Sequence, residues 1–217
     1  MRVKDRMTTN VLTVNLETGV NETSELMKQK KVRRVPVMQE GQLVGIVTET
    51  DLYRAAPSSA TTLSRNELNY LLAKLKIQDI LEKGRTVITV QSDDFIEVAA
   101  RLMREHTISG LPVLDQGKLV GIITETDIFD AFIDILGVKK QHTRVDIFVS
   151  EQIGGLAEVA GIVAQHQANI LNAVVFFDQH RNEYKIILRL EGEAQAAIEA
   201  LSNQYEIDLV TEMDSAK

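Results

Sequence analysis

The sequence contains no cysteine, and this absence excludes three classes of protein at once. Disulfide-stapled scaffolds, thiolate metal sites and enzymes with a cysteine nucleophile all need that side chain. No stretch approaches 18 uninterrupted apolar residues, and the first ten residues lack the apolar segment of a signal peptide. We therefore expect a cytoplasmic protein with no membrane association.

Positive charge is also scarce. Lys and Arg total 24 against 31 Asp and Glu, which gives a formal net charge of −7 at pH 7. Broad nucleic-acid binding relies on Lys and Arg to neutralise phosphates, so this balance argues against a nucleic-acid partner. The composition is otherwise that of an ordinary folded protein, with 44% hydrophobic and 25% charged residues.

Catalytic signatures are few. No glycine-rich phosphate loop is present, and the histidines share no metal-ligand spacing. An enzyme needs a nucleophile, base or metal cluster within mutual reach, so we expect a protein that is not an enzyme. The four histidines are His106, His142, His166 and His180.

What the sequence does contain is an internal repeat. A shift of 76 residues aligns Leu12–Leu52 with Ile88–Ile128 without a gap, and 15 of the 41 aligned positions are identical. Unrelated segments of average composition would match at roughly two or three positions. The copies end almost identically, in GQLVGIVTETDL from Gly41 and GKLVGIITETDI from Gly117. A duplication explains this pattern.

Within each copy, the pattern predicts the order β-α-β-β-α. A short β-branched run, VLTV or VITV, is followed by a stretch with apolar residues three or four positions apart. Two strands then flank a turn, at Gln39–Gly41 or Gln116–Gly117, and a helix begins near the closing Thr-Asp. One such unit is marginally small alone, so we expect the two to pack sheet against sheet.

The segments outside the repeat have different patterns. Residues 57–62 have loop composition, and an amphipathic helix is predicted over residues 63–81, with Ser64 and Glu67 in capping-box spacing. From Arg144 the pattern predicts β-α-β-β-α-β, the ferredoxin-like order. The predicted boundaries are 1–56 for the first copy, 57–76 for the linker, 77–137 for the second copy and 142–215 for the C-terminal domain.

These patterns resemble known families. Paired copies of x-Pro-Val followed by Gly-apolar-apolar-Thr-x-x-Asp resemble tandem CBS (cystathionine-β-synthase) domains, and Gly154-x-Leu-Ala followed by Ala-Asn169-Ile resembles an ACT domain. The order CBS-CBS-ACT is similar to that of the bacterial acetoin-utilisation accessory proteins. The resemblance implies an α+β fold, with a pseudo-two-fold CBS pair and a ferredoxin-like ACT domain, in a regulatory protein.

The repeated motif, Thr48–Asp51 and Thr124–Asp127, allows two interpretations. In one, the hydroxyl and the carboxylate cap a helix at a strand-to-helix junction. In the other, the carboxylate accepts hydrogen bonds from both hydroxyls of a ribose, and threonine hydroxyls and helix N-terminal amides donate to a phosphate. We favour the ligand because both copies also keep the intervening Glu-Thr. The alternating carboxylates of each motif could also hold Mg²⁺.

In tandem CBS families this motif contacts ribose and phosphate, and the partner copy holds the base. The resemblance therefore implies an adenine nucleotide as regulatory ligand, either AMP, ADP, ATP or cyclic di-AMP, in two clefts. One cleft would combine Thr13, Val32 and Arg33 with Thr124, Thr126 and Asp127, and the other would combine Thr89, Ile108 and Ser109 with Thr48, Thr50 and Asp51.

The two clefts are expected to differ in charge. Residues 28–34, KQKKVRR, include Arg33 and Arg34, whereas the equivalent REHTISG carries only Arg104 and His106. The basic run is either a solvated helix C-terminus, where cations oppose the helix dipole, or a phosphate-binding surface. The second interpretation predicts that the first cleft, with Arg33, receives a polyphosphate or cyclic dinucleotide.

In ACT families a small amino acid binds at a strand-to-helix turn across a subunit interface. The resemblance places such a site at Gly154, Gly155 and Asn169, although the chain has Glu151 and Ile153 where the family commonly has Asp and Pro. From the residues alone, a tight turn at the glycines and a turn residue before the strand explain the same pattern.

Two classes of function therefore compete. One is a sensor whose CBS pair binds a nucleotide, and the other is a structural, partner-binding scaffold with empty clefts. In either class a homodimer is expected, because ferredoxin-like units expose strand edges and the run Val174–Phe177 offers apolar surface to cover them.

Overall fold

The computed structural model describes residues 1–55, 74–82, 84, 86–138, 140–150 and 153–214. The chain divides into two compact units, Met1–Ile128 and Phe129–Lys217. The predicted loop at residues 57–62 and the capping box at Ser64 and Glu67 lie outside the described residues. No helix in the described ranges is long and apolar enough to span a bilayer.

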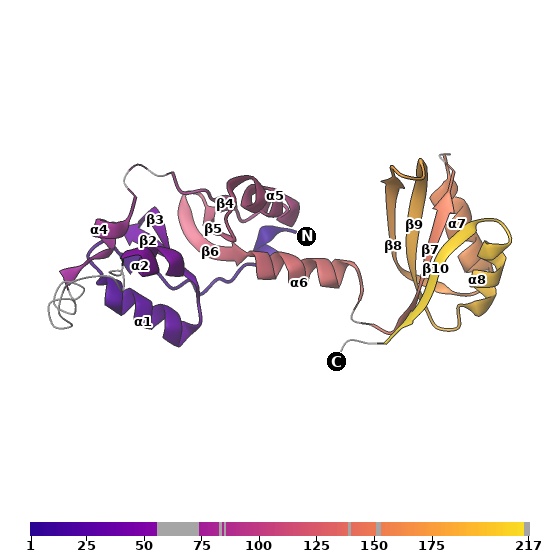
Figure 1. Cartoon of the computed structure of the whole chain (residues 1–217), viewed down its shortest axis with the longest axis horizontal. Coiled ribbons are helices and arrows are strands. Elements are labelled where there is room, and N and C mark those ends of the chain that lie inside the picture. Colours follow the sequence, from indigo (N-terminus) through magenta and orange to yellow (C-terminus); the bar gives the residue numbers. More distant parts are fainter. Residues whose placement is uncertain (56–73, 83, 85, 139, 151–152, 215–217) are drawn as a thin grey trace. The chain divides into compact units, whose positions relative to one another are not determined.

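The first repeat has the predicted β-α-β-β-α order (Figure 1). Its sheet has the order β1-β2-β3, with β1 parallel and β3 antiparallel to β2. Only the last residue of the predicted VLTV run is in a strand, because pairing with β2 begins at Val14. The elements are β1 (Val14–Asn15), α1 (Val20–Lys30), β2 (Arg34–Gln39), β3 (Gln42–Thr48) and α2 (Glu49–Ala55).

The second repeat copies this topology, with the sheet order β4-β5-β6. Both hairpins turn through two residues with positive φ, Glu40-Gly41 (50° and 80°) and Gln116-Gly117 (46° and 79°), which is typical of a type I′ turn. Each predicted turn is therefore confirmed, the first without Gln39, which pairs with Gln42. The elements are β4 (Val90–Gln91), α5 (Ile96–His106), β5 (Gly110–Asp115), β6 (Lys118–Thr124) and α6 (Glu125–Ile135).

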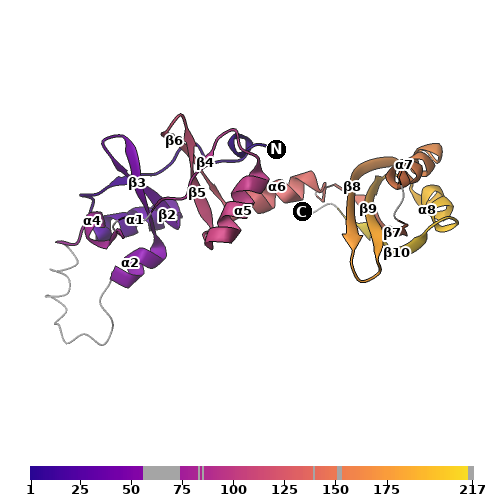
Figure 2. The ribbon, with the colours of Figure 1, turned by 90° about the horizontal axis from the view of Figure 1, so that it is seen from above.

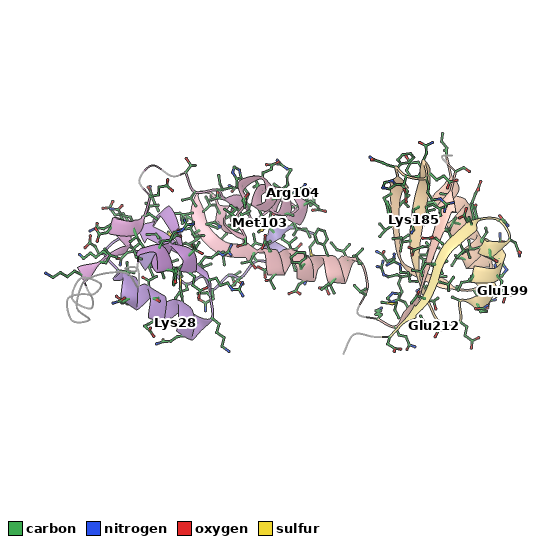
Figure 3. The ribbon with its side chains drawn as sticks, in the orientation of Figure 1. Lys28, Met103, Arg104, Lys185, Glu199 and Glu212 are labelled. Carbon is green, nitrogen blue, oxygen red and sulfur yellow. The ribbon has the colours of Figure 1, made fainter. Side chains whose placement is uncertain are left out.

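The first helix of each repeat buries one face and exposes the other. Met27 and Met103, at equivalent positions, are 1% and 3% exposed, so both lie in the core. Their neighbours Lys28 and Arg104 are exposed near the C-terminal ends of α1 and α5 (Figure 3). The predicted helical periodicity is thus confirmed in both copies.

The opening segment of the chain packs on the second repeat. The backbone N–H of Val3 donates to the carbonyl of Asp94 at 2.8 Å, and Thr8 forms an antiparallel bridge with Ile122. Val3 lies in a short 3₁₀ helix, η1 (Val3–Asp5), and its side chain is fully buried. The sequence pattern does not predict this contact, because three residues carry no detectable period.

The start of the second repeat packs in turn on the first repeat, and this contact corrects the prediction of a long linker helix. The sequence predicts one helix over residues 63–81, but Leu75 and Lys76 are not helical. A separate turn, α4 (Ile77–Ile80), joins the core of the first repeat, with Ile77 fully buried and its N–H donating to the carbonyl of Thr18 at 2.9 Å. The backbone hydrogen bonds of Leu75, Ile77 and Gln78 go to the first repeat, so no helix continues through residues 75 and 76.

A glycine in each repeat leaves room for these exchanged segments. A Cβ atom on Gly45 would lie 2.7 Å from the side chain of Leu81, and one on Gly121 would lie 2.4 Å from the sulfur of Met7. Both distances are shorter than van der Waals contact, so only glycine fits without a shift. This explains the identical glycines of the two copies.

The C-terminal unit has the predicted β-α-β-β-α-β order, in an antiparallel sheet with the strand order β10-β7-β9-β8. Helices α7 and α8 lie on the same face of this sheet (Figure 1; Figure 2). Strand β7 begins at His142, two residues before the predicted start at Arg144, because it pairs there with Met213 of β10. The elements are β7 (His142–Val149), α7 (Gly155–Gln165), β8 (Asn169–Asp178), β9 (Glu183–Glu191), α8 (Gln195–Ser202) and β10 (Glu206–Met213).

The sheet face opposite these helices carries a network of charged side chains. Arg144 donates from Nε and Nη2 to the two oxygens of Asp146, at 2.7 and 2.8 Å, and Asp146 is 1% exposed. Lys185, which extends from this face (Figure 3), contacts Asp146 at 3.2 Å and Asp208 at 2.6 Å. Burial works to raise the pKa of Asp146, but the hydrogen bonds from Arg144 and Lys185 lower it overall. The buried carboxylate is therefore ionised at neutral pH.

Candidate ligand-binding cavity between the two repeats

Each Thr-x-x-Asp motif forms a helix cap. Oδ2 of Asp51 accepts hydrogen bonds from the backbone N and Oγ1 of Thr48, at 2.8 and 2.6 Å, and Oδ2 of Asp127 accepts the same pair from Thr124, both at 2.7 Å. The capping interpretation is confirmed for both copies. The cap occupies one carboxylate oxygen, and no residue within the described ranges donates to Oδ1 of Asp51.

A cavity of about 770 Å³ lies beside Asp51. This volume is within the range of small-molecule sites. The first repeat contributes the junction of β3 and α2, and the segment of α4 contributes a wall through Leu81. The second repeat contributes Ile88, just before β4, and Ile108 and Ser109, just before β5. The cavity therefore has carboxylate, hydroxyl and apolar walls from both copies.

The cavity contains most of one expected group of residues. Thr48, Thr50 and Asp51 line it together with Ile108 and Ser109 of the other repeat. Among the described residues, several of those predicted as nucleotide contacts do not line it. They are Thr89, whose neighbour Ile88 takes its place, and the residues of the other predicted cleft, Thr13, Val32, Thr124, Thr126 and Asp127.

The position of the basic pair differs from the expected one. Arg33 and Arg34 line the cavity of Asp51, whereas the family resemblance groups Arg33 with Thr124, Thr126 and Asp127. Strand pairing explains the difference, because Arg34 lies opposite Thr48 in the β2–β3 ladder. The carbonyl of Arg33 also accepts a hydrogen bond from the N–H of Glu49 at 3.0 Å. Lys28 and Lys30 of the basic run lie in the last turn of α1, where cations oppose the helix dipole, whereas both arginines follow the end of the helix.

The side chain of Arg34 crosses to the second repeat. Its Nη2 donates to Oγ of Ser109 at 2.5 Å, and a Cβ atom on Gly110 would lie 2.3 Å from its Nη1. Burial lowers the pKa of Arg34, and the nearby charge of Glu125 partly opposes this. Arg34 forms no ion pair with any residue that the structure describes.

The C-terminal unit places the predicted amino-acid contacts at two element boundaries. Gly154 precedes α7 with φ 97°, and Gly155 is its buried first residue. Asn169 begins β8, where its side-chain amide donates to Glu191 at 2.9 Å. Glu151 lies outside the described residues. No group of three acidic or histidine side chains in the described ranges is placed to hold a metal ion.

Comparison with protein families decides the identity of the repeat. The model of the CBS domain matches residues 3–58 and 77–134, which together are more than half of the chain. The chain belongs to the CBS domain family. The prediction of a CBS pair is therefore confirmed, and the exchanged opening segments fall inside the two matched ranges.

Curated relatives share the CBS pair. A CBS domain-containing protein of Dictyostelium discoideum is 31% identical over 136 residues, which are 62% of this chain and 92% of the relative. The CBS domain-containing protein YhcV of Bacillus subtilis is 31% identical over 126 residues, or 58% and 81% of the two chains. A homoserine O-acetyltransferase of Methanosphaera stadtmanae is 33% identical, but the match spans only 24% of that enzyme. Its name therefore assigns no activity to this chain.

Solved structures with the same fold include one nucleotide complex. CBSX2 in complex with AMP is 33% identical, with a TM-score of 0.50, over 62% of this chain and 97% of that chain. AcuB of Vibrio cholerae, named as an acetoin utilization protein, is 28% identical, with a TM-score of 0.52, over 64% and 94%. These matches support the CBS pair, and the relation to acetoin-utilisation proteins stays a prediction.

Proposed function

We propose that the CBS pair is a regulatory sensor of an adenine nucleotide, which binds in the Asp51 cavity. The carboxylate of Asp51 carries this proposal. It stands in the wall of a cavity of about 770 Å³, with one oxygen in the helix cap and the other without a donor among the described residues. An oxygen held in this way is ready to accept hydrogen bonds from a ligand.

The chemistry of the walls supports an adenosine ligand. A ribose presents two neighbouring hydroxyls, and a carboxylate can accept hydrogen bonds from both. A purine presents a flat apolar surface, which the side chains of Leu81, Ile88 and Ile108 are suited to cover. The related CBS pair of CBSX2 was solved with AMP, which favours this class of ligand over others.

The ligand is assigned to Asp51 rather than to Asp127. Both carboxylates make the same cap, but only Asp51 is among the residues that line the described cavity. Binding regulates a partner only if the ligand prefers one of two arrangements of the protein, because equal affinity for both shifts nothing.

Isothermal titration calorimetry with AMP on matched variants tests the proposal. Asp51→Asn and Asp127→Asn remove the same charged cap from equivalent helices. Each variant therefore controls for the loss of folding stability in the other. We expect Asp51→Asn to weaken AMP binding about 10-fold or more, because hydrogen bonds to a charged group contribute about 1.5–3 kcal/mol. Asp127→Asn should bind AMP like the unmodified protein.

Thermal unfolding measured with AMP, ADP, ATP and cyclic di-AMP can contradict the proposal. A ligand at 100 times its Kd stabilises the folded state by about 2.7 kcal/mol, which raises the melting temperature measurably. If all four leave the melting temperature unchanged, the sensor proposal fails. The chain would then be a partner-binding scaffold.

For the C-terminal unit we propose an ACT-type domain that mediates self-association and receives a small amino acid at the turn of Gly154 and Gly155. Strand β8 is an edge of the sheet, and its side chains Val175, Phe176 and Phe177 are 42%, 42% and 40% exposed. Large apolar side chains on a strand edge are typical of surfaces that another chain covers.

A further inference from the structure

Helix α6 belongs to both compact units, because the division between them falls inside it, between Ile128 and Phe129. Its first residue contacts the wall of the cavity. The N–H of Glu125 donates to the carbonyl of Ser109 at 3.3 Å, and Ser109 lines the cavity. An α-helix rises about 1.5 Å per residue, so the 11 residues of α6 span about 16 Å. The helix therefore connects the cavity with the C-terminal unit.

The last turn of α6 is held by a side chain of the C-terminal sheet. Asn172 of β8 donates from Nδ2 to the carbonyl of Ile135 at 2.9 Å, and its Oδ1 accepts a hydrogen bond from Nη1 of Arg189 at 3.1 Å. The carbonyl can only accept and the guanidinium can only donate, so these contacts fix the orientation of the amide. The last carbonyls of a helix have no partner within it, and Asn172 satisfies one of them. We call this arrangement of Asn172 and Arg189 the α6 clasp.

The cation that supports the clasp is poorly compensated. Arg189 is 6% exposed, its Nε is buried without a hydrogen-bond partner, and it forms no ion pair with any residue that the structure describes. Burial lowers the pKa of Arg189, the charge of Arg144 lowers it further, and the charge of Asp146 partly opposes both. An unsatisfied buried donor costs about 1–3 kcal/mol, and an opening of the clasp that admits water to Arg189 would recover part of this cost. The clasped state therefore has a competitor that a ligand can shift.

We propose that the α6 clasp carries the nucleotide signal from the cavity into the C-terminal unit. This inference rests on the proposed function and extends it from binding to regulation. A nucleotide in the cavity fixes Ser109 and with it the first turn of α6, so the last turn of the helix stays in contact with Asn172. Without a nucleotide the last turn opens more often. The C-terminal unit then differs between the two states at β8, the strand that carries Asn172.

Linkage between the two events makes the proposal quantitative. If the nucleotide favours the clasped state by a certain factor, the clasp raises the affinity for the nucleotide by the same factor, and such couplings are typically about 5- to 150-fold. Amide hydrogen exchange at the end of α6 measures the first factor, because the N–H of Leu136 bonds to the carbonyl of Phe132 at 2.8 Å. Calorimetry measures the second factor.

Hydrogen exchange and calorimetry of the full chain with AMP test the inference. In the unmodified protein, saturating AMP should slow the exchange of Leu136 about 5-fold or more. Asn172→Asp keeps the acceptor for Arg189 and gives it a counter-charge, but it loses the donor to Ile135 and places a carboxylate at the negative end of the helix dipole. This variant should bind AMP about 5-fold or more weakly, and AMP should no longer slow the exchange of Leu136.

Two further variants separate coupling from stability. Asn172→Ala also removes the donor to α6 but adds no charge, so it should lose the coupling as Asn172→Asp does, and it remains informative if that variant fails to fold. Ser202→Ala removes a similar bond, from Oγ of Ser202 to the carbonyl of Glu199 at 2.8 Å in the last turn of α8. In this control, the affinity for AMP and the effect of AMP on Leu136 should both persist.

The possible outcomes separate the two proposals. AMP binding without slower exchange of Leu136, or an unchanged affinity for AMP in both Asn172 variants, would overturn the role of the clasp and leave the sensor proposal intact. An equal loss in Ser202→Ala would also overturn it, because the effect would then follow stability rather than the contact with α6. Absence of AMP binding to the unmodified protein would overturn the sensor itself, and this inference with it.

Discussion

Replacing Ile77 by alanine tests whether a residue at the start of the second repeat stabilises the first. Ile77 is fully buried in one cluster with Val37 and Val47, which belong to β2 and β3. Truncation of a buried isoleucine costs about 2–5 kcal/mol, depending on how far the site collapses. Hydrogen bonds to Leu16 and Thr18 fix the backbone here. We therefore expect a loss of roughly 3 kcal/mol, within that range.

The strands that lose stability in Ile77→Ala test the reasoning more sharply than the total free energy of unfolding does. Urea unfolding gives the total, and native-state amide hydrogen exchange shows which strands lose protection. In Ile77→Ala, β2 and β3 should exchange faster while β5 and β6 keep their protection. Val3→Ala, the reciprocal change, should affect β5 and β6 instead. Faster exchange of β5 and β6 alone in Ile77→Ala, or a loss well below 1 kcal/mol, would refute the exchange of opening segments.

Two further predictions concern the C-terminal unit. The lowered pKa of Asp146 contributes stability that is present above its unfolded pKa and is lost as pH falls through the folded one. Chemical denaturation should therefore show a decline below about pH 4, and Asp146→Asn should lower stability at pH 7 and flatten that decline. An equally steep decline in the variant would contradict this. Phe176→Glu should shift sedimentation from dimer to monomer, and unchanged sedimentation would exclude association through β8.

The parts of the fold that follow from periodic patterns were predictable. Alternation and turn chemistry located both hairpins, because a positive φ at two successive residues favours a glycine at the second, as at Gly41 and Gly117. Helical spacing predicted the buried faces of α1 and α5, and Met27 and Met103 are buried as expected. These features depend on neighbours within a few residues, which the sequence displays directly.

The parts of the fold that depend on contacts between distant segments were not predictable from such patterns. Val3 belongs to a segment too short to show a period, and the period around Ile77 predicts a helix over residues 63–81 instead, so spacing could not detect the exchange between repeats. One signal existed, since Val3-Lys-Asp and Ile77-Gln-Asp share an apolar-x-Asp spacing. In each, the aspartate accepts a hydrogen bond from the backbone N–H three residues before it, at 2.7 and 2.9 Å. This likeness lies outside the gapless alignment.

The candidate site illustrates the same limit. The sequence identified Thr48 and Asp51, because the motif is local, but it assigned Arg33 to the other cleft. Pairing of β2 with β3 decides that assignment, because it brings Arg33 and Arg34 beside the motif of their own repeat. Register between strands is set by the hairpin, so a prediction that had combined the turn at Glu40-Gly41 with the pairing would have placed Arg34 opposite Thr48.

Identity between the two motifs is a poor guide to which of them binds. In both motifs the threonine and the aspartate form the helix cap. The cap therefore accounts for the identity of these two positions in each copy, but not for that of the intervening Glu-Thr. What distinguishes the motifs lies at positions where the copies differ, above all Arg34 and Gly110. In a duplicated fold, structural requirements keep equivalent residues alike, and specialisation of one site is read from the residues that have diverged beside it.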